Sequence, residues 1–339
     1  MDFGFYLPCY WPDTSYPAQR MYKEMLEEAK FAEELGFVAF AIPEHHFLNT
    51  LVHPNPLLTA VRVASVTKRI PIITAVMVLP LHDMRMLAGE IAQTDCLTDG
   101  RIQIGVGRGA FRYEFDRFGV PMDEARERFD DALRLLVKLL TDEEVSWSSK
   151  YYDFAPLTIT PRPVQKPHPP IWVAAMHEAS IGWAVENGFP VMTTPLREPF
   201  SAAKMQADAF RAAKARAGTT ARASRMSMLR NAYVGTNEAD IREKVRFGHT
   251  KQRQFANVYN TPGEVHRGKI KLLDIAVTEE EIANNIIIGT PERCIEMLER
   301  YRALGIDNLM LNMNFGATHR DVMRSLELFA TRVMPHFSR

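Results

Sequence analysis

Short apolar runs alternate with longer stretches of helical spacing along the first half of the chain. The run from Phe3 to Leu7 ends at Pro8, and residues 22–35 then place apolar side chains every three or four positions until Gly36. This order of strand and then helix recurs, with strands expected at 37–42, 70–79 and 101–106 and helices at 57–66, 86–97 and 125–140. The first half of the sequence therefore predicts four strand–helix units.

The second half continues the pattern. It predicts four further strands, each followed by a helical stretch, at 171–174, 190–193, 226–234 and 308–312. Strands that alternate with helices form a parallel sheet, and eight such units can close into a (β/α)₈ TIM barrel with its site on the loops that follow the strands. An open doubly wound sheet is the alternative that a strand count leaves open. A length of 339 residues is compatible with one domain over 1–339.

Two segments interrupt the alternation. Residues 143–170 hold four aromatic residues and then a proline-rich stretch, which predicts a hairpin near 145–160 and a stiff connector. Residues 247–279 are polar and weakly periodic, and they are longer than an ordinary loop of a compact domain. This second segment is interpreted as a mobile lid over the site, with a plain surface excursion as the alternative.

The composition excludes several classes of protein. A hydrophobic content of 46% with 24% charged residues is typical of a folded globular chain, and the formal net charge of +0 gives no attraction to nucleic acid or an anionic membrane. The partner expected is a small molecule. Cys9, Cys96 and Cys294 form no C-x-x-C pair, which speaks against a zinc site or a disulfide framework and fits a reducing cytoplasm. The start of the chain does not resemble an export signal, and no apolar run is long enough to span a membrane.

The segment after the second predicted strand carries the first candidate chemistry. Glu44, His45 and His46 would lie at the mouth of a barrel, where histidine can act as an acid or a base near neutral pH. A bare pair of histidines also occurs in loops for packing reasons. Metal binding is the weaker reading because no third ligand follows at helical or hairpin spacing.

Two further turns suit an anion. The fourth predicted strand ends in glycines around Arg108, whose guanidinium would suit a phosphate; a tight turn at the barrel rim is the alternative. This segment is not a dinucleotide fingerprint, because it lacks the G-x-G-x-x-G spacing and the next helix is expected only near Pro121. After the fifth strand, residues 174–180 open a helix whose first amides, with Ser180, could hold a phosphate. Ser180 as an incidental helix-start residue is the alternative, with His177 facing solvent.

Several of these segments, in this order, resemble the bacterial luciferase-like flavin-dependent monooxygenases. The resemblance rests on four segments and is clear over about residues 1–194; it is fainter beyond, where 288–292 and the final helix also match. The four segments are Glu44-His45-His46-Phe47 with Asn55-Pro56; Thr74 to Pro80; Gly100-Arg101 through Arg108-Gly109 to Phe118-Gly119; and Trp183-Ala184 through Gly188-Phe189-Pro190.

The resemblance implies a (β/α)₈ barrel, usually a homodimer, that binds FMN at the mouth of its strands. By position, Arg108 would contact the FMN phosphate together with backbone and hydroxyl groups of Met176, His177 and Ser180. The bond between Ala75 and Val76 would be the family's cis peptide, beneath the flavin ring.

The family's mechanism implies roles for the remaining residues. Reduced FMN reacts with O₂ at C4a, and the resulting peroxide oxygenates the substrate while the protein orients the ring and excludes water. His45 matches the family's catalytic histidine, Glu44 and His46 would orient it or line the pocket, and Glu114 would lie nearby. Luciferase has a reactive cysteine where this chain has Gly107, so light emission is not implied.

The expectation is therefore a two-component FMN-dependent monooxygenase that receives FMNH₂ from a separate NAD(P)H:flavin reductase, since the chain has no dinucleotide fingerprint. Its substrate is a small organic molecule of unknown identity. One rival is an F420-dependent oxidoreductase on the same barrel, although the Glu44–Phe47 segment favours the FMN branch. The other is a non-catalytic flavin-binding barrel.

Overall fold

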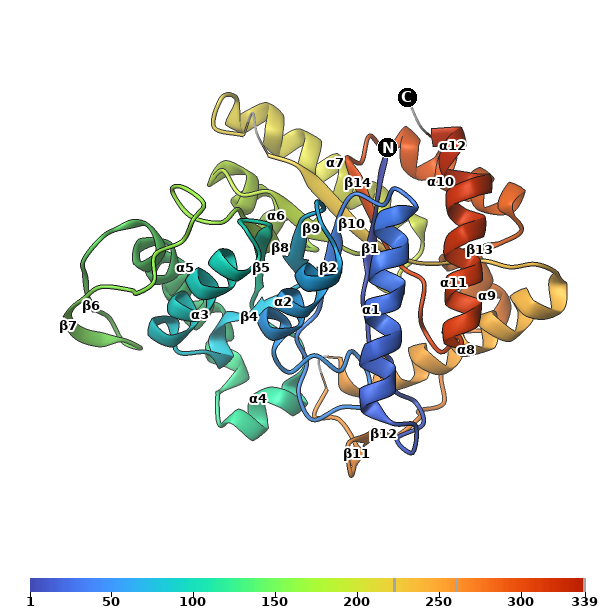
Figure 1. Ribbon diagram of the computed structural model, residues 1–339, viewed down its shortest axis with the longest axis horizontal. Coiled ribbons are helices and arrows are strands. Elements are labelled where there is room, and N and C mark those ends of the chain that lie inside the picture. Colours follow the sequence, from blue (N-terminus) through green and yellow to red (C-terminus); the bar gives the residue numbers. More distant parts are fainter. Residues whose placement is uncertain (222–223, 260, 338–339) are drawn as a thin grey trace.

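Parallel strands close into a barrel in the computed structural model, which describes residues 1–221, 224–259 and 261–337 (Figure 1). Closure is completed by β10, which pairs with β9 on one side and β14 on the other, while β14 also pairs with β1. The predicted TIM barrel is confirmed, and the open sheet is excluded. The barrel strands are β1 (Asp2–Tyr6), β2 (Phe40–Ile42), β3 (Ile72–Thr74) with β4 (Met77–Val78), β5 (Ile102–Gly107), β8 (Ile171–Ala174), β9 (Val191–Thr193), β10 (Met226–Val234) and β14 (Asn308–Asn312).

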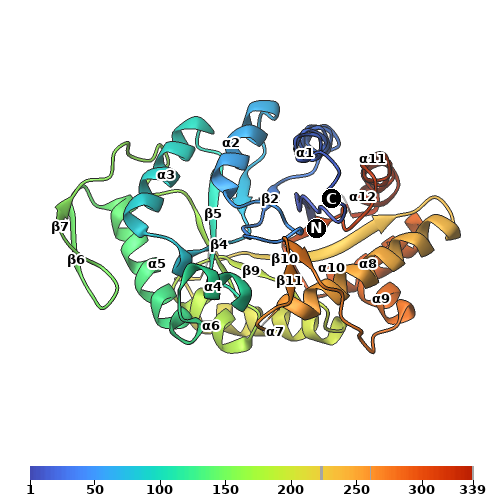
Figure 2. The same cartoon turned by 90° about the horizontal axis from the view of Figure 1, so that it is seen from below.

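Helices surround these strands as a ring, which Figure 2 shows most clearly. Their starts are set by local chemistry: the Asn55 side chain accepts from the Leu58 amide ahead of α2, and Asp83 accepts from the Arg85 amide ahead of α3. The ring consists of α1 (Ala18–Glu34), α2 (Pro56–Val66), α3 (Met84–Leu97), α5 (Ala125–Thr141), α6 (Glu178–Glu186), α7 (Phe200–Ala217), α8 (Glu238–Val258), α10 (Pro291–Ala303) and α11 (His319–Leu328).

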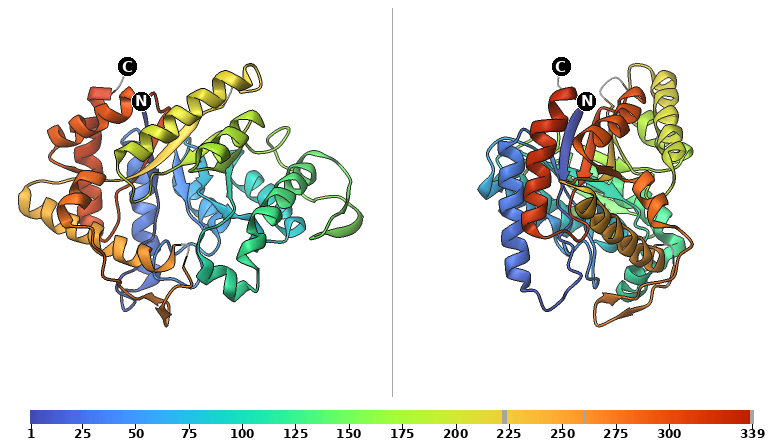
Figure 3. Two further views of the ribbon diagram at one scale, coloured as in Figure 1. Left: turned by 180° about the vertical axis from the view of Figure 1, so that it is seen from behind. Right: turned by 90° about the vertical axis from the view of Figure 1, so that its right-hand side faces the viewer.

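Shorter helices complete the structure. They are α4 (Arg112–Phe118), α9 (Glu279–Asn285), α12 (Met334–Phe337), the 3₁₀ turns Leu79–Leu81 and Met122–Glu124, and a π-helical turn at Phe329–Val333. The N-terminus and α12 lie close together at one end of the molecule in Figure 1, and Figure 3 shows this end from two further sides. No helix within the described ranges combines the length and the apolar character that a membrane crossing needs.

The core has two layers. The larger cluster packs the outer faces of the strands against the helices, while a smaller one fills the inside of the barrel. Inside the barrel, the Trp172 indole donates to Gln103 Oε1 at 2.7 Å, which satisfies its buried N–H. Side chains thus fill the interior of the barrel. This inner cluster consists of Tyr6, Ala39, Ala41, Leu51, Ile73, Trp172, Met192 and Met310.

The first predicted interruption is confirmed as a hairpin. β6 (Val145–Ser148) pairs antiparallel with β7 (Asp153–Leu157) and projects from the barrel wall (Figure 1).

The second interruption needs correction. Residues 247–258 are not loop but the second half of α8, and they are followed by a small hairpin of β11 (Val265–His266) and β12 (Lys269–Ile270). The periodicity of α8 was weak because several polar side chains lie on its inward face, including Lys244, Gln254 and Asn257, which are buried. Several residues of the segment line the cavity at the barrel mouth, among them Lys251, Phe255 and Ile270.

Several short elements were not predicted, β11, β12 and α9 among them. A strand β13 (Ile287–Gly289) pairs with the end of β10, and the helix α4 follows β5 earlier than the helix expected near Pro121. Both are too brief to show a period in the sequence.

Candidate active site

A cavity of about 440 Å³ opens at the carboxyl ends of the barrel strands. Its walls come from the loops after β2, β3, β5 and β8 and from the inward face of α8. His45 and Arg108, which stand 63 positions apart in sequence, line this same cavity. The volume lies within the roughly 300–1,000 Å³ range of small-molecule and cofactor sites. The convergence expected from the barrel topology is therefore observed.

The imidazole of His45 is held between a carboxylate and an aromatic ring. His45 Nδ1 lies 3.0 Å from Glu114 Oε1, and the His45 ring stacks on Phe111 with centroids 4.2 Å apart. Glu114 is buried, and it also accepts the backbone N–H of His46 at 2.7 Å. A carboxylate on Nδ1 leaves Nε2 as the nitrogen that can exchange a proton with a bound molecule. Glu114 thus lies beside His45, as the resemblance implied.

A second carboxylate joins two further histidines. Glu44 Oε1 lies 2.9 Å from His46 Nε2 and 2.8 Å from His82 Nε2, and Glu44 Oε2 accepts the Val78 amide at 2.9 Å. Burial alone would raise the pKa of Glu44, but these hydrogen bonds and the charge of His82 hold it at about 2. The pKa of His82 is raised, because the contact with Glu44 outweighs burial. Glu44 therefore carries a charge at neutral pH and fixes the loop that carries His45.

His82 was not predicted as a site residue from the sequence. It follows η1, the turn Leu79–Leu81 after β4, and so it also lies at the mouth of the barrel. The position after the third strand was the available signal, since barrel sites gather there.

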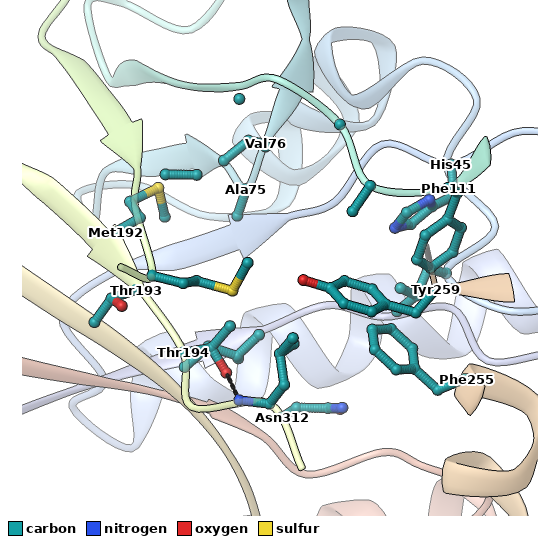
Figure 4. Close-up of a pocket in the computed structure, with 18 of the residues that line it drawn as sticks. His45, Ala75, Val76, Phe111, Met192, Thr193, Thr194, Phe255, Tyr259 and Asn312 are labelled. Atoms are coloured by element: carbon teal, nitrogen blue, oxygen red, sulfur yellow. Dashed lines mark hydrogen bonds between the residues drawn. The ribbon is translucent and has the colours of Figure 1, made fainter. Parts of the chain in front are cut away.

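Another wall of the cavity is tightly packed. The bond between Ala75 and Val76 is cis, as expected, and both residues line the cavity (Figure 4). A Cβ atom built on Gly107 would lie 2.6 Å from Val76 Cγ2, so only glycine fits there without displacing Val76. This wall suits a flat ring that approaches the backbone closely.

Groups suited to an anion line another side of the cavity. Arg108 follows β5, while Met176, His177 and Ser180 come from the start of α6. Arg108 forms no ion pair with any described carboxylate within 4.0 Å, so its charge is free to meet an anion. The first amides of α6 add the positive end of a helix. This donor set fits a phosphate group, and the packed wall beside it fits a flavin ring.

One detail of the expected phosphate site differs. The Ser180 hydroxyl donates to the His177 carbonyl at 2.8 Å and accepts the His177 amide at 3.3 Å. The Ser180 hydroxyl therefore caps the start of α6, which was the alternative interpretation of this residue. A bound phosphate would have to compete with the His177 carbonyl for the hydroxyl proton. His177 is exposed yet still lines the cavity.

The remaining wall is the face of α8, which sequence reasoning did not assign. Lys251, Phe255 and Tyr259 recur at intervals of four residues and line the cavity. The spacing of four residues is typical of one face of a helix and could have identified this wall. It was not used because residues 247–279 were interpreted as a lid or a surface excursion. Phe111 also lines the cavity, whereas Phe5, Phe37 and Met313 belong to the hydrophobic core.

No metal centre is formed by the part of the chain that the structure describes, in which no three His, Cys, Asp or Glu side chains gather with suitable geometry. All three cysteines are free.

Comparisons with known proteins agree with this geometry. Residues 1–308 match the model of the luciferase-like monooxygenase family. The chain is 31% identical over 329 residues to the oxygenase component of a flavin-dependent trigonelline monooxygenase of Acinetobacter baylyi, covering 94% of this chain and 91% of that protein.

Two solved structures extend the comparison. A monooxygenase of Streptomyces bottropensis superposes with a TM-score of 0.88 at 27% identity, with all of both chains covered. An F420-dependent secondary alcohol dehydrogenase superposes with a TM-score of 0.77 at 20% identity, covering 100% of this chain and 99% of that one, and this likeness shows the shared fold alone. The chain therefore belongs to the luciferase-like monooxygenase family, and its enzymatic class is that of the flavin-dependent monooxygenases.

Proposed function

We propose that this protein is the oxygenase component of a two-component system, which binds FMNH₂ from a separate NAD(P)H:flavin reductase and uses O₂ to oxygenate a small organic substrate. The observation that carries the proposal is that the His45–Glu114 pair, the wall formed by Ala75 and Val76, and Arg108 with the start of α6 all line one cavity. The relative named as an oxygenase component supports the separate reductase.

Each part of the cavity has a proposed role. Arg108, the first amides of α6, Met176, His177 and Ser180 hold the FMN phosphate, while Ala75 and Val76 support the ring. When held there, reduced FMN would supply the chemistry with O₂. His45 exchanges a proton at its Nε2, and Glu114 positions it through Nδ1. Glu44 and His46 act indirectly, because the hydrogen bond between them fixes the loop that carries His45.

The apolar side chains around the cavity have a second role. Phe111, Phe255, Tyr259 and Val258 cover the mouth, so they restrict the access of water to the reacting groups. Trigonelline, the compound in the relative's name, is the first substrate to test.

The test is anaerobic titration with photoreduced FMN, followed by mixing with O₂. The protein should bind FMNH₂ and change its rate of reoxidation, and an oxygenated product should carry one atom from ¹⁸O₂. Absence of FMNH₂ binding, or a reoxidation time course identical to that of free FMNH₂, would overturn the proposal.

A second candidate is an F420-dependent oxidoreductase, since such an enzyme shares this barrel. Melting the cofactor-free protein with FMN or with F420 separates the two, because the true ligand raises the melting temperature by mass action. A barrel that stores flavin without turnover is the third candidate. It would keep its flavin affinity and show no catalytic loss when His45 is replaced by alanine.

The proposed assembly is a homodimer, and the proposed location is the cytoplasm, where a reductase and NAD(P)H are available and three free cysteines are stable. Exposed apolar side chains on the neighbouring helices α2 and α3, namely Leu58, Met86 and Leu97, support the dimer.

A further inference from the structure

The inward face of α8 forms one wall of the cavity. Gly248 fixes this helix closely against α9 and the chain that follows it, because a Cβ atom there would lie 3.2 Å from Ile282 and 3.4 Å from Ile286. At the other end, the rings of Phe255 and Tyr259 stack with centroids 4.9 Å apart. Lys251 lies between these two anchored points and lines the cavity. Its position over the cavity is therefore set by packing on both sides.

The ammonium group of Lys251 has no counter-ion. It forms no ion pair within 4.0 Å and no hydrogen bond with any described residue, and burial lowers its pKa to about 8. The Lys251 side chain is partly buried. An ammonium partly removed from water without a partner is less favourable than a paired one, and an anion bound beside it would relieve this cost.

The cavity offers no internal anion for that purpose. The carboxylates that line it are Glu44 and Glu114, and both are already hydrogen-bonded by histidines. An anion for Lys251 must therefore come from a bound molecule.

Other cations at the cavity differ in their surroundings. Arg126 pairs with Asp130 at 3.2 Å, and Arg197 is exposed to solvent. Arg230 is buried, donates to the Asn285 carbonyl and lies over the Tyr301 ring, and it forms no ion pair with a described residue. Arg108 follows β5, with β8 and β9 between it and β10, the strand that leads into α8. Lys251 is thus a second cationic position, on a different wall from Arg108.

Beside Lys251 the wall is aromatic. Phe255 packs edge-on against Phe111 with centroids 5.6 Å apart, and Phe111 stacks on His45. In Figure 4 the ring of Tyr259 projects into the cavity toward Ala75, with Phe255 beneath it. Flat apolar rings of this kind favour a planar aromatic ligand, held by stacked or edge-on contacts.

We propose that Lys251 binds a carboxylate of the substrate and that the substrate's planar ring packs against Phe111, Phe255 and Tyr259, so that the enzyme acts on aromatic or heteroaromatic carboxylates. This inference rests on the proposed function, because only an oxygenase would make the molecule bound beside Lys251 its substrate. The ring would then lie between the imidazole of His45 and the wall assigned to the flavin.

The test compares acids with their neutral amides. Benzoate, nicotinate and 2-naphthoate, and the three matching amides, are titrated by calorimetry into protein saturated with oxidised FMN. The acid should bind about tenfold or more tightly than its amide in at least one pair, the size expected of a hydrogen bond to a charged group. Lys251→Met should abolish that preference, Lys251→Arg should retain it, and Lys204→Met, at an exposed position, should change nothing.

Several results would overturn the inference. They are no preference for the acid in any pair, an equal loss of acid and amide binding in Lys251→Met, and a loss of FMN affinity in Lys251→Met, which would assign the lysine to the cofactor. Circular dichroism and melting temperature establish that the variant is folded. Failure of FMN to bind the unsubstituted protein would instead reject the proposed function, and the acid–amide comparison can still be made on the cofactor-free protein.

Discussion

At the scale of single residues, the site is organised by carboxylates that hold imidazoles. Glu114 contacts His45, and Glu44 contacts both His46 and His82. Sequence alone identified Glu44, His45 and His46, because they follow a barrel strand and so lie at the mouth of the barrel, where active sites form. Glu114 was expected near His45 only through the family resemblance, and His82 was not predicted, since Glu114 is 69 positions from His45 and His82 is 38 positions from Glu44.

Replacement of His45 by asparagine should reduce the rate of substrate oxygenation by roughly 10²- to 10⁴-fold, as expected for loss of a general acid or base. The affinity for FMN should remain near its original value, because His45 is not on the side of the cavity that suits the phosphate. Single-turnover kinetics and FMN fluorescence measure the two quantities.

The matched variant is Glu114→Gln, which keeps a hydrogen-bonding side chain but removes its charge. A positioning role requires a shifted pH–rate profile in addition to a slower rate, whereas a merely structural role would lower stability without moving the profile. Full activity of His45→Asn would refute the assigned role.

Lys251 should make the binding of an aromatic acid depend on pH. Burial lowers its pKa to about 8, so the ammonium form is present below that value and is lost above it. Acid affinity should therefore be flat below about pH 7 and should fall by up to tenfold per unit above about pH 8. In Lys251→Arg this decline should vanish, because arginine stays charged.

Calorimetric titrations of benzoate between pH 6 and 10 measure this effect. His45, Glu44, Glu114 and Tyr259 also line the cavity, but they are common to both proteins and the comparison isolates the lysine. A decline of equal slope in Lys251→Arg would contradict the assignment.

At the scale of elements, most barrel strands and their helices were predictable, because buried parallel strands leave short apolar runs and their helices repeat every three or four residues. The elements that failed had other causes. α8 presents polar residues to the barrel mouth and so lost its apolar stripe, while β13 and α4 are too short to show a period.

β5 offers a test of how closely the strands pack. A Cβ atom on Gly105 would lie 2.0 Å from the carbonyl oxygen of Thr74, a backbone atom that cannot turn aside. Gly105→Ala should therefore lower the free energy of unfolding by about 2–4 kcal/mol, a large effect typical of an overpacked core.

The control is Gly89→Ala in α3, where nothing lies within 4 Å of the added atom. That substitution should be neutral or stabilise by up to about 1 kcal/mol, since alanine is the better helix former. Urea denaturation measures both variants, and equal behaviour of the two would contradict the packing argument.

At the scale of the whole molecule, the proposed homodimer can be tested through the exposed side chains of α2 and α3. Sedimentation should give about twice the chain mass of 38.6 kDa, and the double variant Leu58→Asp, Met86→Asp should sediment as a monomer. Leu272→Asp, at a position 40% exposed and away from these helices, should remain dimeric. A monomeric unsubstituted protein would refute the dimer.

The sequence by itself determined the strand–helix alternation, the barrel it closes into and the loops that carry His45, Arg108 and Ser180, because each depends on local periodicity or on a rule that holds for every barrel. Only the tertiary structure decided which residues meet across the cavity. The contacts of His45 with Glu114, of Glu44 with His82, and of Phe111 with Phe255 on α8 join segments far apart in the chain. Such contacts depend on how the helices and loops pack over the barrel mouth, and that packing leaves no periodic trace in the sequence.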